Sequence, residues 1–268
     1  MYAVCAMLWL MLVPALALAV EIVAHRGASA DAPENTLAAY RLAWEQNADA
    51  IECDLRLTRD GRIVCLHDAT TDRTTGVKGK LADLTFEEAR RLDAGSWKDP
   101  RYRGEKLPTL AEILALVPPD RRILIEMKVG PEIVPLVQRD IQASGLRPEQ
   151  ITLISFDEKV VAACRRAMPN IKANFLYAFK LKDGVWSSTH EELIGRMKRM
   201  NATGLGVSLT EESLPIVNEE LARGLRQANI ELHVWTIDDP GLARRAVQLG
   251  ALSITTNRPG ALRAELAR

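Results

Sequence analysis

Short runs of β-branched and apolar residues alternate along this chain with longer amphipathic segments. Short apolar runs bounded by turn residues are typical of strands, and apolar residues at helical spacing are typical of helices. Nine runs have strand character: 22–25, 50–57, 63–67, 123–128, 151–156, 172–177, 204–209, 231–236 and 252–255. Seven segments between them have helical character: 34–47, 109–116, 131–144, 157–167, 189–199, 213–228 and 239–249.

This alternation predicts an α/β protein with a parallel sheet, because each helix returns the chain to the start of the next strand. The chain has 268 residues, and about 250 residues with about eight repeats suit a closed (β/α)8 barrel. Neither a Gly-x-Gly-x-x-Gly nor a Gly-x-x-x-x-Gly-Lys loop occurs in the sequence, which disfavours a nucleotide-binding sheet. We expect one TIM-like barrel domain, residues 20–268.

Nine strand candidates exceed the eight places of such a barrel. The second and third candidates are joined only by residues 58–62, which contain Asp60-Gly61. Asp-Gly between two β runs is typical of a hairpin, and so short a connection forces antiparallel pairing. One of these two strands is therefore expected to be an antiparallel addition to the barrel, with an irregular barrel at this point as the alternative.

The length of the hairpin loop sets which side chains share a face. With a two-residue loop, Arg59 pairs with Arg62, which places Asp54 opposite His67 and Glu52 on the same face. A loop one residue longer shifts this pairing by one. The expectation is that two carboxylates and a histidine point the same way.

Four cysteines are too few for a disulfide scaffold in a chain of this length. Cys5 lies in the N-terminal segment, and no Cys-x-x-Cys spacing suggests zinc. In the two-residue register Cys53 and Cys65 lie on opposite faces, whereas a disulfide needs Cβ atoms about 3.8 Å apart. We expect Cys53, Cys65 and Cys164 to be free thiols.

The stretch 69–108 is the longest without a repeat of the strand–helix pattern, and it is rich in turn residues over 70–76. It is too long for a plain connection. We interpret it as a small inserted cap after the third strand candidate.

Residues 1–19 form an apolar run without charge that ends Ala17-Leu18-Ala19. This length and ending are typical of a cleaved signal peptide, with an uncleaved N-terminal anchor as the alternative. The interpretation predicts an exported protein, periplasmic or secreted, with no stable membrane span after cleavage.

Composition adds little about partners. Charged residues make up 26% of the chain and hydrophobic residues 47%, as in ordinary globular proteins. Lys and Arg (35) balance Asp and Glu (35), so the net charge gives no electrostatic argument for a nucleic-acid or an anionic-membrane partner. No pattern in the sequence predicts an oligomeric state.

Charged and imidazole side chains gather at the ends of several predicted strands: His25, Arg26, Glu52, Asp54, His67, Glu126 and Lys128. In a barrel these ends converge on one open face. Three converging carboxylates would repel one another unless a cation lay between them, and all-oxygen ligands suit Mg²⁺ or Ca²⁺ better than zinc.

Two histidines beside such a cation can serve as general acid and base. Arg26 and Lys128 supply positive charge for an anionic group such as phosphate. Each residue also has a structural interpretation: a strand-end histidine is often structural, and Lys128 could simply pair with Glu126. The combination favours a metal-assisted phosphate site, because polar residues at several strand ends need partners or a function.

The ordered series of motifs resembles the glycerophosphodiester phosphodiesterase family over roughly residues 22–260. The motifs are His25-Arg26-Gly27, Pro33-Glu34-Asn35-Thr36, Glu52-x-Asp54, His67-Asp68, Asp93-Ala94-Gly95-Ser96-Trp97, Leu107-Pro108-Thr109-Leu110, Glu126-x-Lys128, Ser155-Phe156, Val234-Trp235-Thr236 and Thr256-Asn257-Arg258-Pro259.

The resemblance implies a barrel with a small insertion and one divalent cation, Mg²⁺ or Ca²⁺, held by Glu52, Asp54 and Glu126. It implies that His25 and His67 exchange protons with the attacking and leaving oxygens. The attack would come from a neighbouring glycerol hydroxyl, with water completing hydrolysis. A small-molecule glycerophosphodiester would yield glycerol 3-phosphate and an alcohol.

It further implies that Arg26 and Lys128 stabilise charge on the phosphoryl oxygens. Trp235 matches a position near the glycerol side, although a core role is an alternative. Asn257 stands where the family usually has Asp, and Asp238 where Asn is common. Both positions are expected to lie outside the metal and proton-transfer groups.

Two other functions stay open from the sequence. One is a lyase-like phospholipid phosphodiesterase related to sphingomyelinase D, which would release a cyclic phosphate. The other is a barrel that binds phosphodiesters without turning them over, since a barrel fold hosts many functions.

Overall fold

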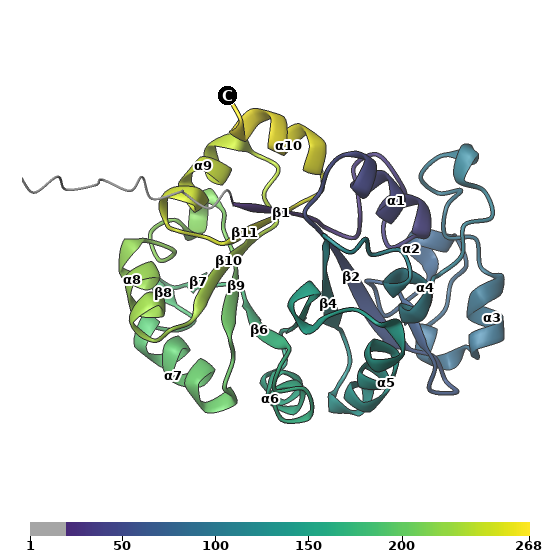
Figure 1. Cartoon of the computed structure of the whole chain (residues 1–268), viewed down its shortest axis with the longest axis horizontal. Helices are drawn as coiled ribbons and strands as arrows, with labels where there is room; N and C mark the ends of the chain where they lie inside the picture. Colours follow the sequence, from purple (N-terminus) through teal and green to yellow (C-terminus); the bar gives the residue numbers. More distant parts are fainter. Residues whose placement is uncertain (1–19) are drawn as a thin grey trace, which may run out of the picture.

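A computed structural model describes residues 20–268 of the chain (Figure 1). The segment 1–19, where we predict a signal peptide, lies outside the described residues. No helix among residues 20–268 is long and apolar enough to cross a bilayer.

Eight parallel strands form a closed barrel, which confirms the predicted fold class. Along the ring they are β1 (Glu21–Ala24), β11 (Ser253–Thr256), β10 (Glu231–Trp235), β9 (Gly204–Ser208), β6 (Lys172–Tyr177), β5 (Ile151–Ser155), β4 (Arg122–Met127) and β2 (Ala50–Leu57). The ring closes where β1 pairs with β2, through Val23 opposite Ala50.

Helices surround the strands on the outside (Figure 1). They are α1 (Leu37–Glu45), α4 (Leu110–Leu114), α5 (Val134–Ser144), α6 (Glu158–Ala167), α7 (His190–Met200), α8 (Glu219–Gln227), α9 (Pro240–Gln248) and α10 (Pro259–Leu266). The expected helix over 213–228 is shorter than predicted, because the Asn218 side chain accepts hydrogen bonds from the first turn and starts the helix there. Helix α10 was not predicted.

Residues with opposite parity along a strand face opposite sides of the barrel wall. In β2, Ile51 and Cys53 belong to the main apolar core beneath the helices, whereas Glu52 and Asp54 lie on the other face. Inside the barrel a separate small apolar cluster includes Val23, Ala50, Leu124, Ile154 and Leu176. The carboxylates of β2 therefore lie directly above an apolar plug.

The predicted hairpin is present, but the preferred register is wrong by one residue. Strand β3 (Ile63–Cys65) pairs antiparallel with β2, with Leu55 opposite Cys65. The loop has three residues, 59–61, and Gly61 adopts a left-handed conformation (φ 69°) that closes it. Asp54 thus lies opposite Leu66, to which its carbonyl is hydrogen-bonded, and not opposite His67.

The corrected register also overturns the parity argument for the cysteines. Cys53 and Cys65 now lie on the same face, and both are fully buried in the main core. The expected outcome still holds, since Cys53, Cys65 and Cys164 are all free.

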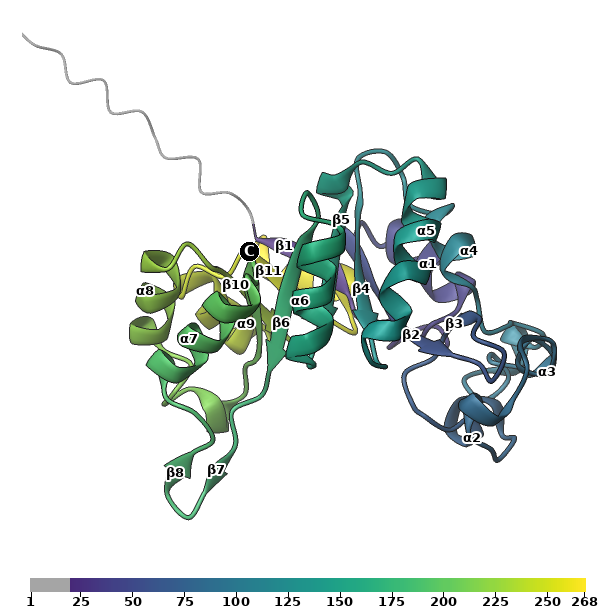
Figure 2. The ribbon, with the colours of Figure 1, turned by 90° about the horizontal axis from the view of Figure 1, so that it is seen from below.

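The stretch 69–108 follows β3 and stands beside the barrel (Figures 1 and 2). It contains α2 (Asp72–Thr75), α3 (Phe86–Arg91) and two 3-10 turns, Leu81–Asp83 and Pro100–Tyr102. A separate apolar cluster holds it against β3: Val64, Leu66, Leu81, Ala89, Ala94 and Leu107. This small core gives the insertion a fixed shape at the barrel rim.

A second excursion was not predicted. After β6, strands β7 (Leu181–Lys182) and β8 (Val185–Trp186) form a short antiparallel hairpin. It projects from the barrel on the same side as α2 (Figure 2). Two-residue strands leave no recognisable periodicity in a sequence.

Candidate active site

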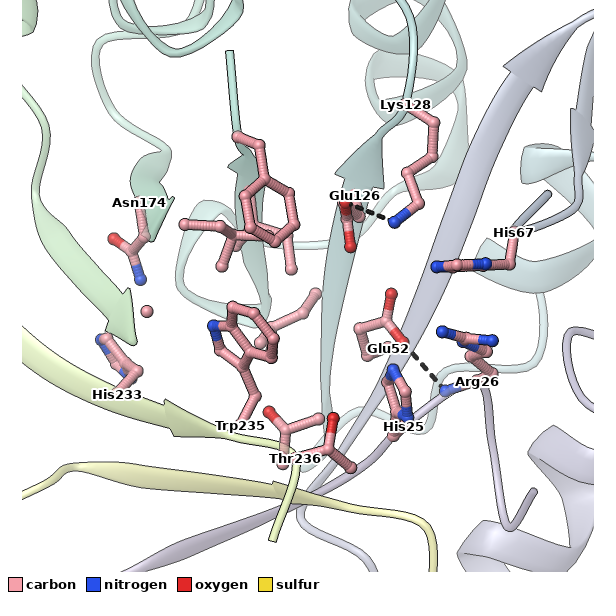
Figure 3. Close-up of a pocket in the computed structure, with 16 residues that line it drawn as sticks. His25, Arg26, Glu52, His67, Glu126, Lys128, Asn174, His233, Trp235 and Thr236 are labelled. Carbon is pink, nitrogen blue, oxygen red and sulfur yellow. Dashed lines mark hydrogen bonds and ion pairs between the residues drawn. The ribbon is translucent and has the colours of Figure 1, made fainter. Parts of the chain in front are cut away.

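A pocket opens at the carboxyl ends of the barrel strands (Figure 3). Seven of the eight predicted site residues line it: His25, Arg26, Glu52, His67, Glu126, Lys128 and Trp235. The eighth, Asp54, is fully buried directly behind them. The structure therefore brings together all eight residues chosen from the sequence.

The turn after β1 brings a backbone donor to the carboxylates. Arg26 has a positive φ (58°), and its N–H donates to Oε2 of Glu52 over 2.9 Å. The next residue, Gly27, also has a positive φ, and a Cβ there would lie 2.6 Å from the backbone of Ala39. Only glycine allows this close approach of β1 to helix α1.

Parallel register places the three acidic side chains side by side. Asp54 of β2 is paired with Glu126 of β4, and Glu52 lies one inward position earlier on β2. One oxygen from each of Glu52, Asp54 and Glu126 lies within 4.8 Å of the others, and all three residues are buried. Three carboxylates held this close together repel one another unless a positive charge compensates them.

The crowding is visible in the pKa values. Burial and the neighbouring charges of Asp54 and Glu126 raise the pKa of Glu52 well above its ordinary value. Burial and Asp54 raise the pKa of Glu126 to about 7. Burial also acts to raise the pKa of Asp54, but Lys128 and Arg26 outweigh it and the pKa is lowered. The upward shifts of Glu52 and Glu126 show that burial and mutual repulsion oppose the charged form of these two carboxyls.

Two cations flank the acidic group. Lys128 Nζ lies 2.7 Å from Oε1 of Glu126 and 3.2 Å from Oδ1 of Asp54. Arg26 Nε lies 3.3 Å from Oδ2 of Asp54. Both side chains also line the open pocket, so they can meet an anionic ligand there.

The donor set fits a hard divalent cation. Oε1 of Glu52 is buried and has no hydrogen-bond donor among residues 20–268, and Oδ1 of Asp54 has only the ionic contact with Lys128. Three carboxylates with unused oxygens at one point are the ligands that Mg²⁺ and Ca²⁺ prefer. Glu52, Asp54 and Glu126 are therefore the residues that can hold such an ion.

His25 is held by a neutral partner. Its Nδ1 lies 2.8 Å from Oδ1 of Asn257. The Nδ2 of Asn257 donates to the carboxylate of Asp238 over 2.8 Å, which fixes the amide with its oxygen toward His25. Because that oxygen only accepts, Nδ1 carries the proton and Nε2 is left free. Burial and repulsion by Arg26 lower the pKa of His25 to about 4.

His67 is held by a charged partner. Its Nδ1 lies 2.7 Å from Oδ1 of Asp68. Arg73 of α2 donates to Asp68 over 2.6 Å and makes two bonds of 2.7 Å to Glu34. Glu34 in turn accepts from Arg26 over 2.9 Å. Burial lowers the pKa of His67, although Asp54 and Asp68 act in the opposite direction.

Three functional neighbours escaped prediction from the sequence. Asn257 and Asp238 were expected to lie outside the proton-transfer groups, yet they form the hydrogen-bond chain that orients His25. Neither side chain lines the pocket, but the sequence does not reveal their contact with His25, because it joins residues 232 positions apart. Arg73 had no signal beyond its place in the turn-rich stretch 70–76.

An apolar wall completes the pocket. Trp235 meets Phe156 edge to face with ring centroids 5.4 Å apart, and both line the pocket. Beyond Trp235 the pocket reaches Asn174 and His233 inside the barrel (Figure 3). The site thus has a charged half and an apolar half.

The sequence profile of the glycerophosphoryl diester phosphodiesterase family matches residues 25–261. The chain belongs to this family. Membership makes it an enzyme of the glycerophosphodiester phosphodiesterase class, and the matched range runs from His25 to beyond Asn257.

Relatives of similar length support the assignment. A glycerophosphodiester phosphodiesterase of Caldanaerobacter subterraneus is 33% identical over 245 residues, covering 90% of this chain and 95% of that protein. One from Bacillus subtilis is 30% identical, covering 88% and 83%.

Solved structures of the family share the barrel. A glycerophosphodiester phosphodiesterase from Agrobacterium tumefaciens superposes with a TM-score of 0.75 at 27% identity, over 91% of this chain and 99% of that one. A phosphodiesterase from Oleispira antarctica, in complex with the product sn-glycerol-3-phosphate, gives a TM-score of 0.79 at 23% identity, over 92% and 97%.

Proposed function

We propose that this protein hydrolyses glycerophosphodiesters to glycerol 3-phosphate and an alcohol, with a divalent cation at the acidic group. One observation carries the proposal. Three buried carboxylates, two cations and two histidines with different partners meet in one pocket at the carboxyl end of the barrel. The family to which the chain belongs performs this class of reaction.

Glu52, Asp54 and Glu126 would hold the cation. When bound, such an ion polarises a phosphoryl oxygen and offsets the negative charge that develops on it. Mg²⁺ and Ca²⁺ both accept three carboxylates with further oxygen ligands, and either satisfies this donor set.

His25 is suited to the role of general base. Its neutral amide partner and its low pKa leave Nε2 unprotonated near neutral pH. Nε2 can therefore accept the proton of the attacking oxygen, whether that oxygen belongs to water or to a glycerol hydroxyl.

His67 is suited to the role of general acid. Asp68 accepts from its Nδ1, and its negative charge stabilises the imidazolium form more strongly than the neutral amide beside His25 does. The imidazolium would give a proton to the leaving alcohol oxygen as the P–O bond breaks. If water attacks directly, His25 ends protonated and His67 neutral, and exchange of one proton with solvent restores both. If a glycerol hydroxyl attacks, a cyclic phosphate forms first. Water would then open it, with His67 accepting the proton of the water and His25 returning a proton to the glycerol hydroxyl.

Arg26 and Lys128 would bind the phosphoryl oxygens, since both border the pocket and carry charge there. Trp235, with its ring facing the same space, would limit access on the glycerol side. The two cations would thus contact the phosphodiester on one side, and the Trp235 ring would contact it on the other.

Activity after metal removal tests the proposal. Chelated protein is assayed with glycerophosphocholine before and after addition of Mg²⁺ or Ca²⁺, and glycerol 3-phosphate is measured. We expect release only with added metal. No release with any glycerophosphodiester would contradict the proposal, and a cyclic phosphate as end product would indicate a lyase.

We also propose that the protein is exported, on the strength of the apolar segment 1–19 and its Ala-Leu-Ala ending. Mass spectrometry of the protein from an expressing cell, with a new N-terminus near Val20, would support it. Retention of Met1 in the mature protein would contradict it.

A further inference from the structure

Exposed apolar side chains are unevenly distributed over the molecule. Among residues 20–268, seven large apolar side chains are exposed: Val77, Trp97, Phe156, Leu181, Val185, Val247 and Leu252. Val77 and Trp97 lie in the insertion between β2 and β4, and the other three lie on connections that follow the carboxyl ends of β5 and β6, where the pocket opens. Only Val247 and Leu252 lie toward the opposite end. Single exposed apolar residues are ordinary, but a bias to one end indicates an interaction surface.

The β7–β8 hairpin carries the most exposed of these side chains. Val185 is 70% exposed and Leu181 57% exposed. The base of the hairpin is fixed, because Trp186 packs edge to face on Phe179 with centroids 6.3 Å apart. Tyr177 Oη also lies 2.9 Å from Oγ of Ser187. The hairpin is therefore fixed at its base and exposes Leu181 and Val185 to solvent, where they do not contribute to the core of the barrel.

A second tip lies in the insertion. Val77, two residues after the end of α2, is 50% exposed. Thr71 holds this loop in shape, since its hydroxyl donates to the carbonyl of Val77 and its N–H to the carbonyl of Gly79. Helix α2 and the β7–β8 hairpin project on the same side of the barrel (Figure 2). The two tips thus face one way, on either side of the pocket end.

Both tips are basic. Lys180 and Lys182 flank Leu181 against the single acid Asp183, and all of them are exposed. Lys78 and Lys80 follow Val77, with no acidic residue over 76–80. Apolar side chains beside lysines on projecting loops match the boundary of an anionic bilayer, where apolar groups enter the acyl region and lysines meet phosphates.

We propose that the 76–80 loop and the β7–β8 hairpin form a docking surface for an anionic lipid membrane. The surface would hold the barrel by its pocket end without any transmembrane segment. The proposal rests on exposure and charge and does not depend on the reaction.

Co-sedimentation with vesicles tests the proposal. Residues 20–268, which contain every strand of the closed barrel, are mixed with vesicles of phosphatidylcholine with or without phosphatidylglycerol. We expect the protein to sediment with the anionic vesicles and much less with the neutral ones. Changing Leu181→Asp and Val185→Asp together should weaken anionic binding roughly tenfold, as should Lys180→Glu with Lys182→Glu.

The matched control changes Val247→Asp and Leu252→Asp, both 45% exposed at the opposite end, and should bind as the unaltered protein does. Thermal melting of every variant reports the fold independently of activity. If the double hairpin variant melts early, Val185→Ser, at a position that is mostly in solvent, takes its place. Equal binding by tip and control variants, or no binding to either vesicle, would overturn the proposal and leave a protein partner for this surface.

Discussion

The Nδ1 atom of His25 lies 2.8 Å from Oδ1 of Asn257, an amide that Asp238 orients through its own carboxylate. The second pocket histidine, His67, has a carboxylate in the equivalent place, 2.7 Å from Nδ1. A neutral partner favours a histidine that accepts a proton, and an anionic partner favours one that donates. The two histidines therefore differ in the partner of Nδ1, which is an amide oxygen for His25 and a carboxylate for His67.

Exchanging the two residues behind His25 tests this relationship. Asn257→Asp alone places a second carboxylate against Asp238. We expect kcat to fall about tenfold, because the hydrogen bond from Nδ2 of Asn257 to Asp238, which orients residue 257, is lost. Adding Asp238→Asn restores an amide–carboxylate pair and should recover most of the activity. Equal loss in the single and double variants would contradict the positioning role.

The same double variant should change the pH dependence. Burial and Arg26 lower the pKa of His25 to about 4 in the native protein. A carboxylate at position 257 stabilises the imidazolium and raises that pKa, so the base form would be lost at a higher pH. We expect the acid limb of kcat/KM against pH to move upward in the double variant. An unmoved limb would mean that another group controls it.

A substrate with a good leaving group separates the two histidines. A p-nitrophenyl glycerophosphodiester expels an alcohol that needs no proton, so a missing general acid matters little. We expect His67→Ala to lose at least about a hundredfold with glycerophosphocholine but far less with this substrate. His25→Ala should lose activity with both. Equal sensitivity of the two variants would show that the roles are not divided in this way.

Removing one of the three acidic side chains should weaken the binding of the divalent cation. Glu126→Gln takes one of three carboxylates from the buried group, and we expect Mg²⁺ or Ca²⁺ to bind at least about 100-fold more weakly, by titration calorimetry. Glu149→Gln, at an exposed carboxylate distant in the chain, is the control. Cation-dependent stabilisation against heat should likewise vanish only in Glu126→Gln.

Arg73 should matter although it does not line the pocket. It bridges Asp68 and Glu34, and so ties the insertion to both His67 and Arg26. We expect Arg73→Met to lower kcat about tenfold with a small change in KM, because His67 loses its fixed carboxylate. Arg91→Met, at an exposed position of the same insertion, should behave as the native protein. A matching loss in both would point to a general effect on the insertion.

Glu231 links stability to acid pH at the amino end of the barrel. Burial acts to raise its pKa, but the close contact with His233 Nε2, at 3.5 Å, and the hydrogen bond from Lys172 lower it to about 2. A lowered carboxyl pKa stabilises the fold above the ordinary value of 4.5, and this contribution is lost as the pH falls toward 2. With partial exposure taken into account, Glu231→Gln should cost about 1–2 kcal/mol at pH 7 in urea unfolding, and little near pH 2. A constant cost at both pH values would contradict this linkage.

Much of the site follows from the sequence because it depends on period and parity. Alternation along β2 places Glu52 and Asp54 on the same face of the strand. Eight repeated strand–helix units predict a closed barrel, in which this face is directed to the inside. The parallel pairing of β2 with β4 then sets Asp54 beside Glu126. These are local rules that hold for any sequence with this pattern.

Tertiary structure decided the rest, for reasons of loop geometry and distance along the chain. The hairpin after β2 has three loop residues instead of two because Gly61 adopts a left-handed conformation. This local preference shifts the pairing of β2 with β3 by one residue along the whole hairpin. Asn257 reaches His25 only when β11 closes the ring against β1. The sequence by itself determined which side chains gather in the pocket, and the closed barrel determined which neighbours hold them in place.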